Sequence, residues 1–471
     1  FISTYDITKI DYQDKTQCEI YTRSKSLYIH CEHCEDAVSA ILSSRELLFK
    51  DMKQVYQIEL TNFPYTPPAP TLLIQPDISI ITLRYIAMCS KRSFIPQGRI
   101  LDVFNKFSPT HHVTLTLDEF CIAPPTVKNL LYPIFTFKHI QILRLNNFSP
   151  YFVCRFLHHL IKHGFKAQTI IMEGYSHIIP EQLRMEKTHG YRPLNLIFKN
   201  CNFSDDINER LFTQLGKYPG EISRLSFINY SLTNSGWKSL FDTVTQCRPF
   251  KEMESFEINN VSSSQLYEDQ VPESIKALLK HCRFIMKLSI SNWSQPIHYG
   301  INNFQNYLLL SEINLSGQDM TQPLPDDFKM LRMVHCLNLS NCNFTFNSLQ
   351  SLFKTLSTAR TQFAIRLADI KLPDSHWRNF YSSLSSFPPL SSLCELDWSG
   401  NHLFNEDINN FAKYFFNGAK LKYLQIDRIF NSQQADDLYN LLYQLSDKGL
   451  LGISVGGSSE TNFSGNLKSL L

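Results

Sequence analysis

The sequence lacks the features that mark several large classes of protein. It contains no run of about 18 apolar residues, so no segment is long enough to cross a membrane as a helix. Its formal net charge is only +2, which gives no bulk electrostatic case for binding nucleic acid. Glycine-rich phosphate-binding motifs, G-x-S-x-G and H-E-x-x-H are also missing. The chain therefore carries no assembled signature of a common enzyme class.

Cysteine usage favours a reducing compartment. The 12 cysteines are scattered along the chain and form no disulfide framework. The nine N-x-S/T glycosylation sequons favour the same reducing compartment, because most fall on or just after expected strands, where glycans would crowd the chain. We therefore expect a cytoplasmic location, or a space continuous with the cytosol such as a cilium. The first residue is Phe1 rather than Met, and we expect that the N-terminus is truncated.

A short apolar pattern recurs along two thirds of the chain. In HCLNLSNCNFT it comprises Leu337, Leu339, Asn341 and Phe344, and the same spacing returns in LNLIFKNCNFS and LCELDWSGNHL. The pattern L-x-L-x-x-[NC]-x-L is the core of the leucine-rich repeat. The second apolar position serves as an anchor, and anchors recur about every 28 residues. The anchors are Leu145, Met172, Phe198, Phe227, Ile258, Ile290, Leu315, Leu339, Leu367, Trp398, Ile426 and Val455.

A period of this length leaves room for a full α-helix in each repeat, as in ribonuclease-inhibitor-type repeats. Helices are expected at 149–163, 205–217, 233–247, 273–282, 346–357, 374–386, 405–418 and 433–448. Many open with Ser, Asn, Asp or Thr, the preferred N-cap residues. The predicted fold class is α/β: a leucine-rich-repeat solenoid, a ribonuclease-inhibitor-like horseshoe with parallel strands on its concave face and helices on its convex face.

Residues 1–50 have a different pattern. Period-two alternation predicts three antiparallel strands before residue 34, and a helix follows with Glu35 and Asp36 in its first turn. Three strands closed by one helix resemble the C-terminal half of a pleckstrin-homology (PH) domain. This partial PH-like β-plus-helix module is the first expected domain, and the missing half would lie upstream of Phe1.

Three further segments complete the expected organisation. Residues 51–139 form a connector and irregular first repeats, with candidate strands at Gln57–Leu60, Ser79–Leu83 and Val113–Leu117. Residues 140–456 are the regular repeats, and 457–471 are a Gly/Ser-rich tail. Two excursions, 175–193 and 262–273, break the period. They are either tolerated loops or sites of partner contact.

Cysteine and histidine clusters predict no metal or catalytic site. The segment from His30 to Cys34 contains a CxxC pair, but a closed zinc site needs four ligands and no second pair is near. We expect a strand end there, with Cys31 or Cys34 buried. His158 and His159 are adjacent on a helix, where neighbours point about 100° apart, so we expect ordinary surface or core histidines.

Three inward-facing residues are expected to hold turns. Cys201, Cys342 and Asn401 occupy the repeat position that accepts Asn or Cys, where the side chain bonds turn backbone. No histidine or acid recurs at a fixed relation to these cysteines, so they are not expected to be nucleophiles. We predict no catalytic residue, no cofactor-binding residue and no cofactor.

Residues that alternate with the anchors point out of the concave face. The middle of this face is small and polar, and its C-terminal part carries mixed charge. The absence of a basic stripe argues against a phosphate-lined track. Such a face either admits a segment of a partner protein or is the ordinary surface of a solvated sheet. The candidate protein-binding residues are Arg144, Asn146, Lys199, Ser226, Glu257, Ser289, Asn314, Asn338, Arg366, Asp397, Gln425 and Asp427.

The order of a partial PH-like module, a Pro-containing connector and a long repeat array resembles the CARMIL family of actin-regulatory leucine-rich-repeat proteins. The resemblance implies a PH-like domain that leads into a ribonuclease-inhibitor-like solenoid. That family binds capping protein through a disordered tail, which this chain lacks, so that activity does not transfer. The lipid-contacting half of the PH-like module is also absent, so lipid contact is not supported. The Phe- and Asn-rich repeats resemble a divergent protist version.

The resulting functional prediction is a non-catalytic protein-binding scaffold of the cytoskeleton, with the cilium or flagellum axoneme as one setting. Its expected partners are other proteins, not nucleic acid. A first alternative is a small-GTPase regulator of the RanGAP type, for which Arg192 and Arg428 are candidate residues. A second alternative is an adaptor or innate-sensor repeat array.

Overall fold

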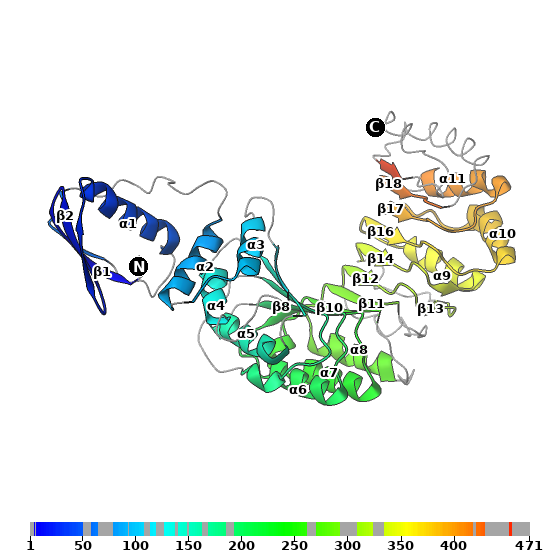
Figure 1. The fold of residues 1–471 in the computed structure, drawn as a ribbon. Coiled ribbons are helices and arrows are strands. Elements are labelled where there is room, and N and C mark those ends of the chain that lie inside the picture. Colours follow the sequence, from blue (N-terminus) through cyan, green and yellow to red (C-terminus); the bar gives the residue numbers. More distant parts are fainter. Residues whose placement is uncertain are drawn as a thin grey trace. The chain divides into compact units, whose positions relative to one another are not determined.

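The structure is a computed structural model of the whole chain. It describes residues 4, 6–49, 58–64, 79–92, 94–107, 114–118, 127–136, 140–147, 150–162, 168–184, 193–260, 270–292, 309–323, 334–417, 421–428 and 452–454. The chain divides into two compact units, Phe1–Arg192 and Pro193–Leu471, which are described separately. Figure 1 shows their elements.

The first unit begins with a small sheet closed by a helix (Figure 1). Its elements are β1 (Ile7–Asp14), β2 (Gln17–Thr22), β3 (Ser26–His30), α1 (Cys34–Phe49) and β4 (Glu59–Thr61). The strand order is β3-β2-β1-β4, with antiparallel pairing except between β1 and β4. Ile10, Cys18 and Val38 pack in its core. The three predicted strands and their helix are confirmed, while the PH-like identity stays a prediction.

One candidate repeat strand belongs to this small sheet. Gln57–Leu60 was expected to start the repeats, but Glu59 and Leu60 lie in β4, which pairs in parallel with Lys9 and Ile10 of β1. The local pattern could not reveal this, because the partner strand lies about 50 residues earlier in the sequence.

The rest of the first unit contains helices and three repeat strands. The elements are α2 (Ile80–Lys91), α3 (Gly98–Lys106), β5 (Thr114–Asp118), α4 (Val127–Thr136), β6 (Ile142–Asn146), α5 (Pro150–Lys162), β7 (Thr169–Glu173) and the 3₁₀ turn η3 (Pro180–Gln182). Strands β5, β6 and β7 are parallel neighbours. The strand expected at Val113–Leu117 corresponds to β5.

The strand expected at Ser79–Leu83 is wrong, because these residues begin helix α2. Ser79 is the N-cap, and its side chain accepts a hydrogen bond from the Thr82 amide. The buried residues Ile81, Tyr85 and Met88 recur at helical spacing. A segment of five residues does not by itself distinguish a strand from a helix, and the periodicity of the longer segment decides.

The second unit is a run of strand–helix repeats. Its first half contains β8 (Leu194–Lys199), α6 (Asp205–Gly216), β9 (Ile222–Ile228), α7 (Asn234–Gln246), η4 (Arg248–Phe250), β10 (Ser255–Asn259), α8 (Gln270–His281) and β11 (Lys287–Ser291). Its second half contains β12 (Glu312–Asn314), β13 (Asp319–Met320), β14 (Cys336–Asn338), β15 (Asn343–Phe344), α9 (Phe346–Leu356), β16 (Phe363–Arg366), α10 (Asp374–Ser383), η7 (Leu384–Ser386), β17 (Leu393–Asp397), η8 (Asn405–Asp407), α11 (Ile408–Asn417), β18 (Tyr423–Gln425) and β19 (Gly452–Ser454).

These strands form one sheet with helices on one side (Figure 1). The order β8-β9-β10-β11-β12-β14-β16-β17-β18-β19 follows the sequence, with parallel pairing throughout, while β13 and β15 form a separate small pair. The fold is therefore a solenoid of the leucine-rich-repeat type. The helices predicted between 149 and 418 all occur, and the one at 433–448 lies outside the described residues.

The predicted anchors form the core beneath the sheet. Every anchor from Leu145 to Ile426 is at most 2 % exposed, and Val455 lies outside the described residues. Neighbouring anchors pair across the strands, as Phe198 does with Phe227. Those two rings stack with their centroids 5.4 Å apart. The anchors therefore fix which residues of each strand face the helices and which face away.

A left-handed turn follows each repeat strand of the main sheet from β6 to β18, two residues after the anchor. Residues at this position have φ between 47° and 78°, a region that favours Asn, Asp and Gly. They are Asn147, Gly174, Asn200, Asn229, Asn260, Asn292, Gly317, Asn341, Asp369, Gly400 and Arg428. We call this series the turn ladder.

Backbone hydrogen bonds join the turn ladder from repeat to repeat. The Asn200 amide donates to the Ile228 carbonyl (2.9 Å), and the Asn341 amide donates to the Ala368 carbonyl (2.8 Å). Side chains add a second series, in which Asn260 Nδ2 donates to Asn229 Oδ1 and Asn229 Nδ2 donates to Asn200 Oδ1. Asparagine therefore supplies both the turn conformation and a lateral bond between repeats.

We expect Asn229→Ala to lower the free energy of unfolding by about 1–2 kcal/mol, because alanine disfavours the left-handed conformation and bonds no neighbour. Asn229→Gly should cost less, since glycine keeps the turn and loses only the side-chain bonds. Urea denaturation of both variants measures the difference. Equal losses would show that the left-handed conformation at this position carries no cost.

Candidate functional site

The residues predicted to face away from the helices form one row across the second unit. Each lies opposite the next in the register of the parallel strands. We call this the central row, which comprises Ile197, Ser226, Glu257, Ser289, Asn314, Asn338, Arg366, Asp397 and Gln425. Because strand spacing is about 4.8 Å, neighbouring side chains of the row contact one another. The predicted alignment is confirmed, and the use of the row for binding stays a prediction.

The other candidate residues lie two positions further along their strands or in the first unit. Lys199 pairs with Ile228, and so belongs to the row that passes through Asn259 and Ser291. Asp427 follows β18 and accepts a hydrogen bond from Gln425 Nε2 (2.7 Å). Arg144 and Asn146 lie on β6, where Arg144 Nε donates to Glu173 Oε2 of β7. Arg144 is therefore already paired within its own sheet.

A further row of outward residues lies two positions before the central row. We call it the start row, and its chemically distinctive members are Arg224, Lys287, Glu312, Glu395 and Tyr423. The candidate set omitted these residues. Extending the period-two alternation one step toward each strand start would have found them.

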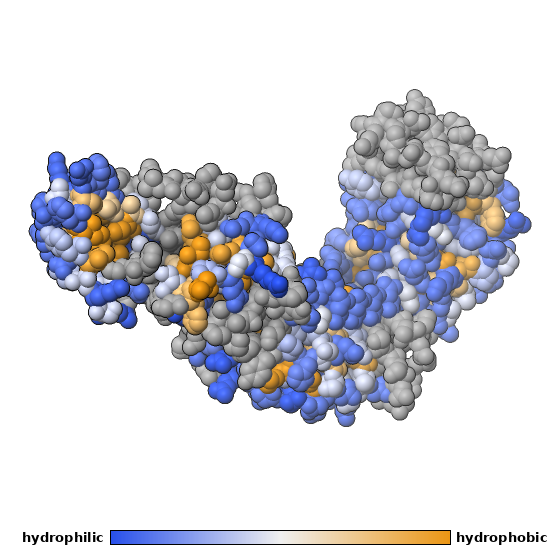
Figure 2. Space-filling view, viewed as in Figure 1, coloured by the Kyte–Doolittle hydropathy of each residue, from blue (hydrophilic) through white to orange (hydrophobic). Residues whose placement is uncertain are grey.

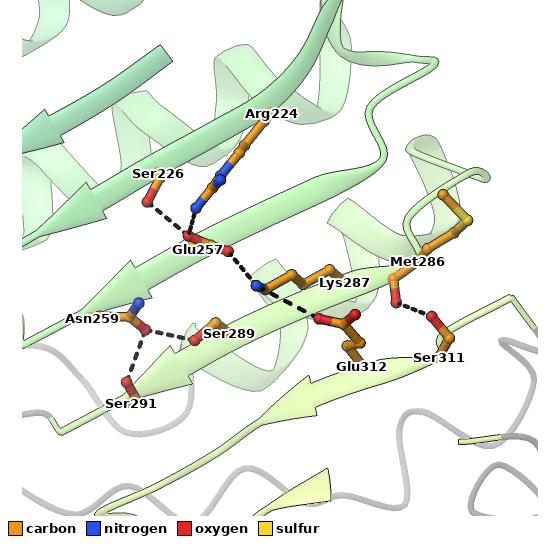
Figure 3. Close-up of polar contacts among 10 residues, drawn as sticks. All are labelled: Arg224, Ser226, Glu257, Asn259, Met286, Lys287, Ser289, Ser291, Ser311 and Glu312. Carbon is orange, nitrogen blue, oxygen red and sulfur yellow. Dashed lines mark hydrogen bonds and ion pairs between the residues drawn. The ribbon is translucent and has the colours of Figure 1, made fainter. Parts of the chain in front are cut away.

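The start row and the central row share a chain of alternating charges (Figure 3). Arg224 Nη2 lies 2.7 Å from Glu257 Oε2. Lys287 Nζ lies 3.2 Å from Glu257 Oε1 and 3.5 Å from Glu312 Oε2. Ser226 Oγ adds a hydrogen bond to Glu257 at 3.0 Å. The buried Glu257 carboxylate is thus bonded from both neighbouring strands.

These contacts settle the protonation state of Glu257. Burial alone would raise the pKa of its carboxyl, but the hydrogen bond and charge of Arg224, the charge of Lys287 and the hydrogen bond of Ser226 together lower the pKa below the ordinary value. Glu257 is therefore ionised at neutral pH and serves to join three strands. It is buried, so a partner has little access to it.

A lowered folded-state pKa predicts acid sensitivity. The stabilisation by Glu257 is fully present above its unfolded-state pKa and is lost as pH falls through the folded-state value. We expect Glu257→Gln to lower the unfolding free energy at pH 7 by roughly 1–3 kcal/mol and to flatten its dependence on pH below about 4.5. Denaturation midpoints across pH measure both effects. As a control, Glu312→Gln removes an exposed carboxylate and should change little; a loss equal to that of Glu257→Gln would contradict this account.

Several other central-row side chains form hydrogen bonds within their own sheet or the turns that follow it. Asn314, Asn338 and Asp397 each accept a hydrogen bond, at 3.1 Å, from the serine amide two residues later. Ser289 is buried and donates to Asn259 Oδ1 (2.6 Å). These hydrogen bonds hold the side chains against the ends of their strands, and only Asp397 keeps a second carboxylate oxygen beyond the bonded one.

The predicted inward turn-holders are confirmed. Asn401 Nδ2 donates to the Leu367 carbonyl (2.7 Å), and the Cys342 thiol lies 3.1 Å from the Leu315 carbonyl. Cys201 bonds the Lys199 carbonyl of its own turn. Gln318, at the same repeat position, was missed because the pattern names only Asn and Cys. Burial raises the pKa of Cys342 to about 12, which keeps its thiol protonated at neutral pH.

Cys34 is fully buried, as expected for a strand end that leads into α1. Burial raises the pKa of its thiol to about 12. Across the described ranges, no group of three or more His, Cys, Asp or Glu side chains is arranged to hold a metal ion.

Exposed residues of the strand face cluster on β16, β17 and β18. Arg366, Glu395, Tyr423 and Gln425 are exposed, with Tyr423 at 47 %, and Asp397 is half-buried. We call these five residues the C-terminal patch. Glu395 pairs in register with Tyr423, and Asp397 pairs with Gln425. Figure 2 shows that hydrophilic residues predominate on the visible face of this unit.

An ion pair borders the C-terminal patch along the turn ladder. Arg428 Nη2 lies 2.5 Å from Asp369 Oδ2, two repeats away. Gly400 lies between them, and a side chain on it would collide with the Asp369 carboxylate. Glycine therefore leaves the space in which the pair forms. Arg428 is a candidate residue of the GTPase-regulator alternative, and its guanidinium forms this ion pair with Asp369. The other candidate, Arg192, lies outside the described residues.

Comparisons with known proteins give only distant likenesses. No protein-family model matches the sequence, and no curated protein matches it. An internalin of Listeria monocytogenes is 14 % identical with a TM-score of 0.40, over 83 % of this chain and 98 % of its own. A leucine-rich-repeat protein of Leptospira interrogans is 14 % identical with a TM-score of 0.28, over 72 % and 95 %. These likenesses are too weak to support a function. Within the described residues, no helix is long and apolar enough to span a membrane.

Proposed function

We propose that this chain is a non-catalytic protein-binding scaffold of the cytoskeleton, and that it docks its partner on the C-terminal patch. The observation that carries the proposal is the contrast along the strand face. Toward β9 and β10 the polar side chains are buried and bonded to one another, whereas on β16 to β18 they are accessible.

The composition of the C-terminal patch suits a protein partner. Arginine and tyrosine are enriched among the residues that contribute most to protein–protein binding, because both combine a flat apolar surface with hydrogen-bonding groups. Arg366 on β16 and Tyr423 on β18 lie on either side of β17, which carries Glu395 and Asp397. A partner segment of mixed charge with an apolar residue over Tyr423 would match this arrangement.

The cytoskeletal setting rests on the order of the domains. A strand-and-helix module precedes the solenoid, as in the CARMIL family that the sequence resembles. We extend the proposal to the cilium or flagellum axoneme as one cytoskeletal assembly in which such a scaffold would act. Its location is then cytoplasmic, in contact with cytoskeletal proteins.

Affinity capture of the tagged full chain from an extract of the source cells, with chemical cross-linking, tests this proposal. We expect an identified actin-, microtubule- or axoneme-associated protein, with cross-links at β16 to β18. The double variant Arg366→Glu/Tyr423→Ala should reduce its capture at least about tenfold, because a central arginine or tyrosine commonly contributes more than 1.4 kcal/mol.

The matched control is Lys413→Glu, which reverses an exposed charge on helix α11. It should leave capture unchanged. Recovery of only metabolic enzymes would overturn the cytoskeletal assignment. Equal capture by the wild type and the double variant would overturn the assignment of the C-terminal patch.

A further inference from the structure

A basic pocket lies in the first unit, remote in sequence from the C-terminal patch. Its volume is about 570 Å³, and its walls are the exposed face of α5 and the segment around η3. This size falls within the range of small-ligand sites, roughly 300–1,000 Å³. The η3 wall is part of segment 175–193, which interrupts the repeat period. The sequence is compatible with two interpretations of that segment, a tolerated loop or a site of partner contact.

Helix α5 presents a stripe of basic side chains to the pocket. Arg155, His158, His159 and Lys162 all line it, and their spacing of three, four and seven residues places them on one face of a helix. The opposite face, which includes Val153, Phe156 and Leu160, is buried in the core. The amphipathic pattern therefore directs the basic stripe outward.

The two histidines lie closer than the sequence predicted. Adjacent helical residues were expected to point apart, yet the rings of His158 and His159 have centroids 5.5 Å apart and both line the pocket. Long, rotatable side chains can converge even when their Cα–Cβ bonds diverge. The pocket thus gathers two imidazoles between two permanent cations.

The opposite wall is held in place by buried residues. Ile178, Pro180 and Leu183 are buried, and the Leu183 amide donates to the Pro180 carbonyl at 2.9 Å. Arg184 follows this turn and adds a third permanent cation to the lining. The wall is an ordered part of the fold that faces the basic stripe.

The charges around the pocket are unbalanced. Among the described residues that line it, Arg155, Lys162 and Arg184 are positive and Glu181 alone is acidic. Neither Arg155 nor Arg184 forms an ion pair with another described residue. Like charges gathered around one concave site repel each other, and an anion in the site would relieve that repulsion.

We propose that this pocket binds a phosphate-bearing ligand. Guanidinium groups match phosphate oxygens with paired hydrogen bonds, which favours phosphate over a chloride-like anion. Arg155 and Arg184 approach from opposite walls, and the imidazoles and Lys162 supply further donors. Ile179 gives the pocket one apolar wall for the body of the ligand. The same chemistry is offered by a free polyphosphate and by a phosphorylated lipid headgroup.

The test uses the full chain and two probes. Inositol hexakisphosphate, measured by isothermal titration calorimetry, represents a free ligand. Phosphatidylcholine vesicles with and without a phosphoinositide, measured by flotation, represent a lipid headgroup. We expect binding that weakens with added salt. Arg155→Gln/Arg184→Gln should weaken it at least about tenfold, because charge-assisted hydrogen bonds are lost on both walls.

The matched control is Lys15→Gln/Lys106→Gln, which removes two exposed cations of the same unit away from the pocket. It should bind like the wild type. If the Arg-to-Gln variant fails to fold, Arg155→Lys/Arg184→Lys keeps the charge and should still bind more weakly, because lysine lacks the paired geometry. Binding of the free probe indicates a soluble phosphate ligand, and binding that requires vesicles indicates a lipid headgroup. No binding of either probe, or equal binding by the arginine variants and the control, would overturn the proposal.

Discussion

The backbone hydrogen bond from each left-handed turn to the next repeat is the constraint on which the second unit depends. Two residues after each anchor from Phe198 to Trp398, an amide such as that of Asn229 donates to a carbonyl of the following repeat, here that of Asn259. The bond requires a positive φ, which Asn, Asp and Gly adopt at low cost. It holds each repeat in the same register as its neighbour. The buried anchors then stack, and the alternate side chains align in rows.

The function proposed for the sheet follows from those rows. Where strands β9 to β11 meet, the rows bring together Arg224, Glu257 and Lys287, and these charges compensate one another. Where β16 to β18 meet, the same positions carry exposed residues, among them Arg366 and Tyr423. One geometric rule therefore produces a bonded, rigid part and an accessible part of the same face. The basic pocket of the first unit has a separate origin, in the amphipathic pattern of helix α5.

Much of the repeat fold could be predicted because its signals are local. Phe198 and Trp398 are recognisable as anchors from their own strands, and the helices from their caps and apolar periods. The burial of Glu257 could not be predicted, since its partners come from strands about 30 residues away on either side. The five residues from Ser79 fit a strand as well as a helix, and the helical period shows only when the segment is followed to Met88. The convergence of His158 and His159 depends on side-chain rotamers, which sequence spacing does not specify.

Hydrogen–deuterium exchange of the full chain measures the turn ladder directly. The amides of Asn200, Asn229 and Asn341 are the donors in bonds between repeats. If those bonds fix the register, these turn amides will exchange as slowly as the amides of the strands beside them. If they exchange as fast as exposed loop amides, the turns do not hold the repeats together, and the row geometry from which the C-terminal patch was inferred loses its basis.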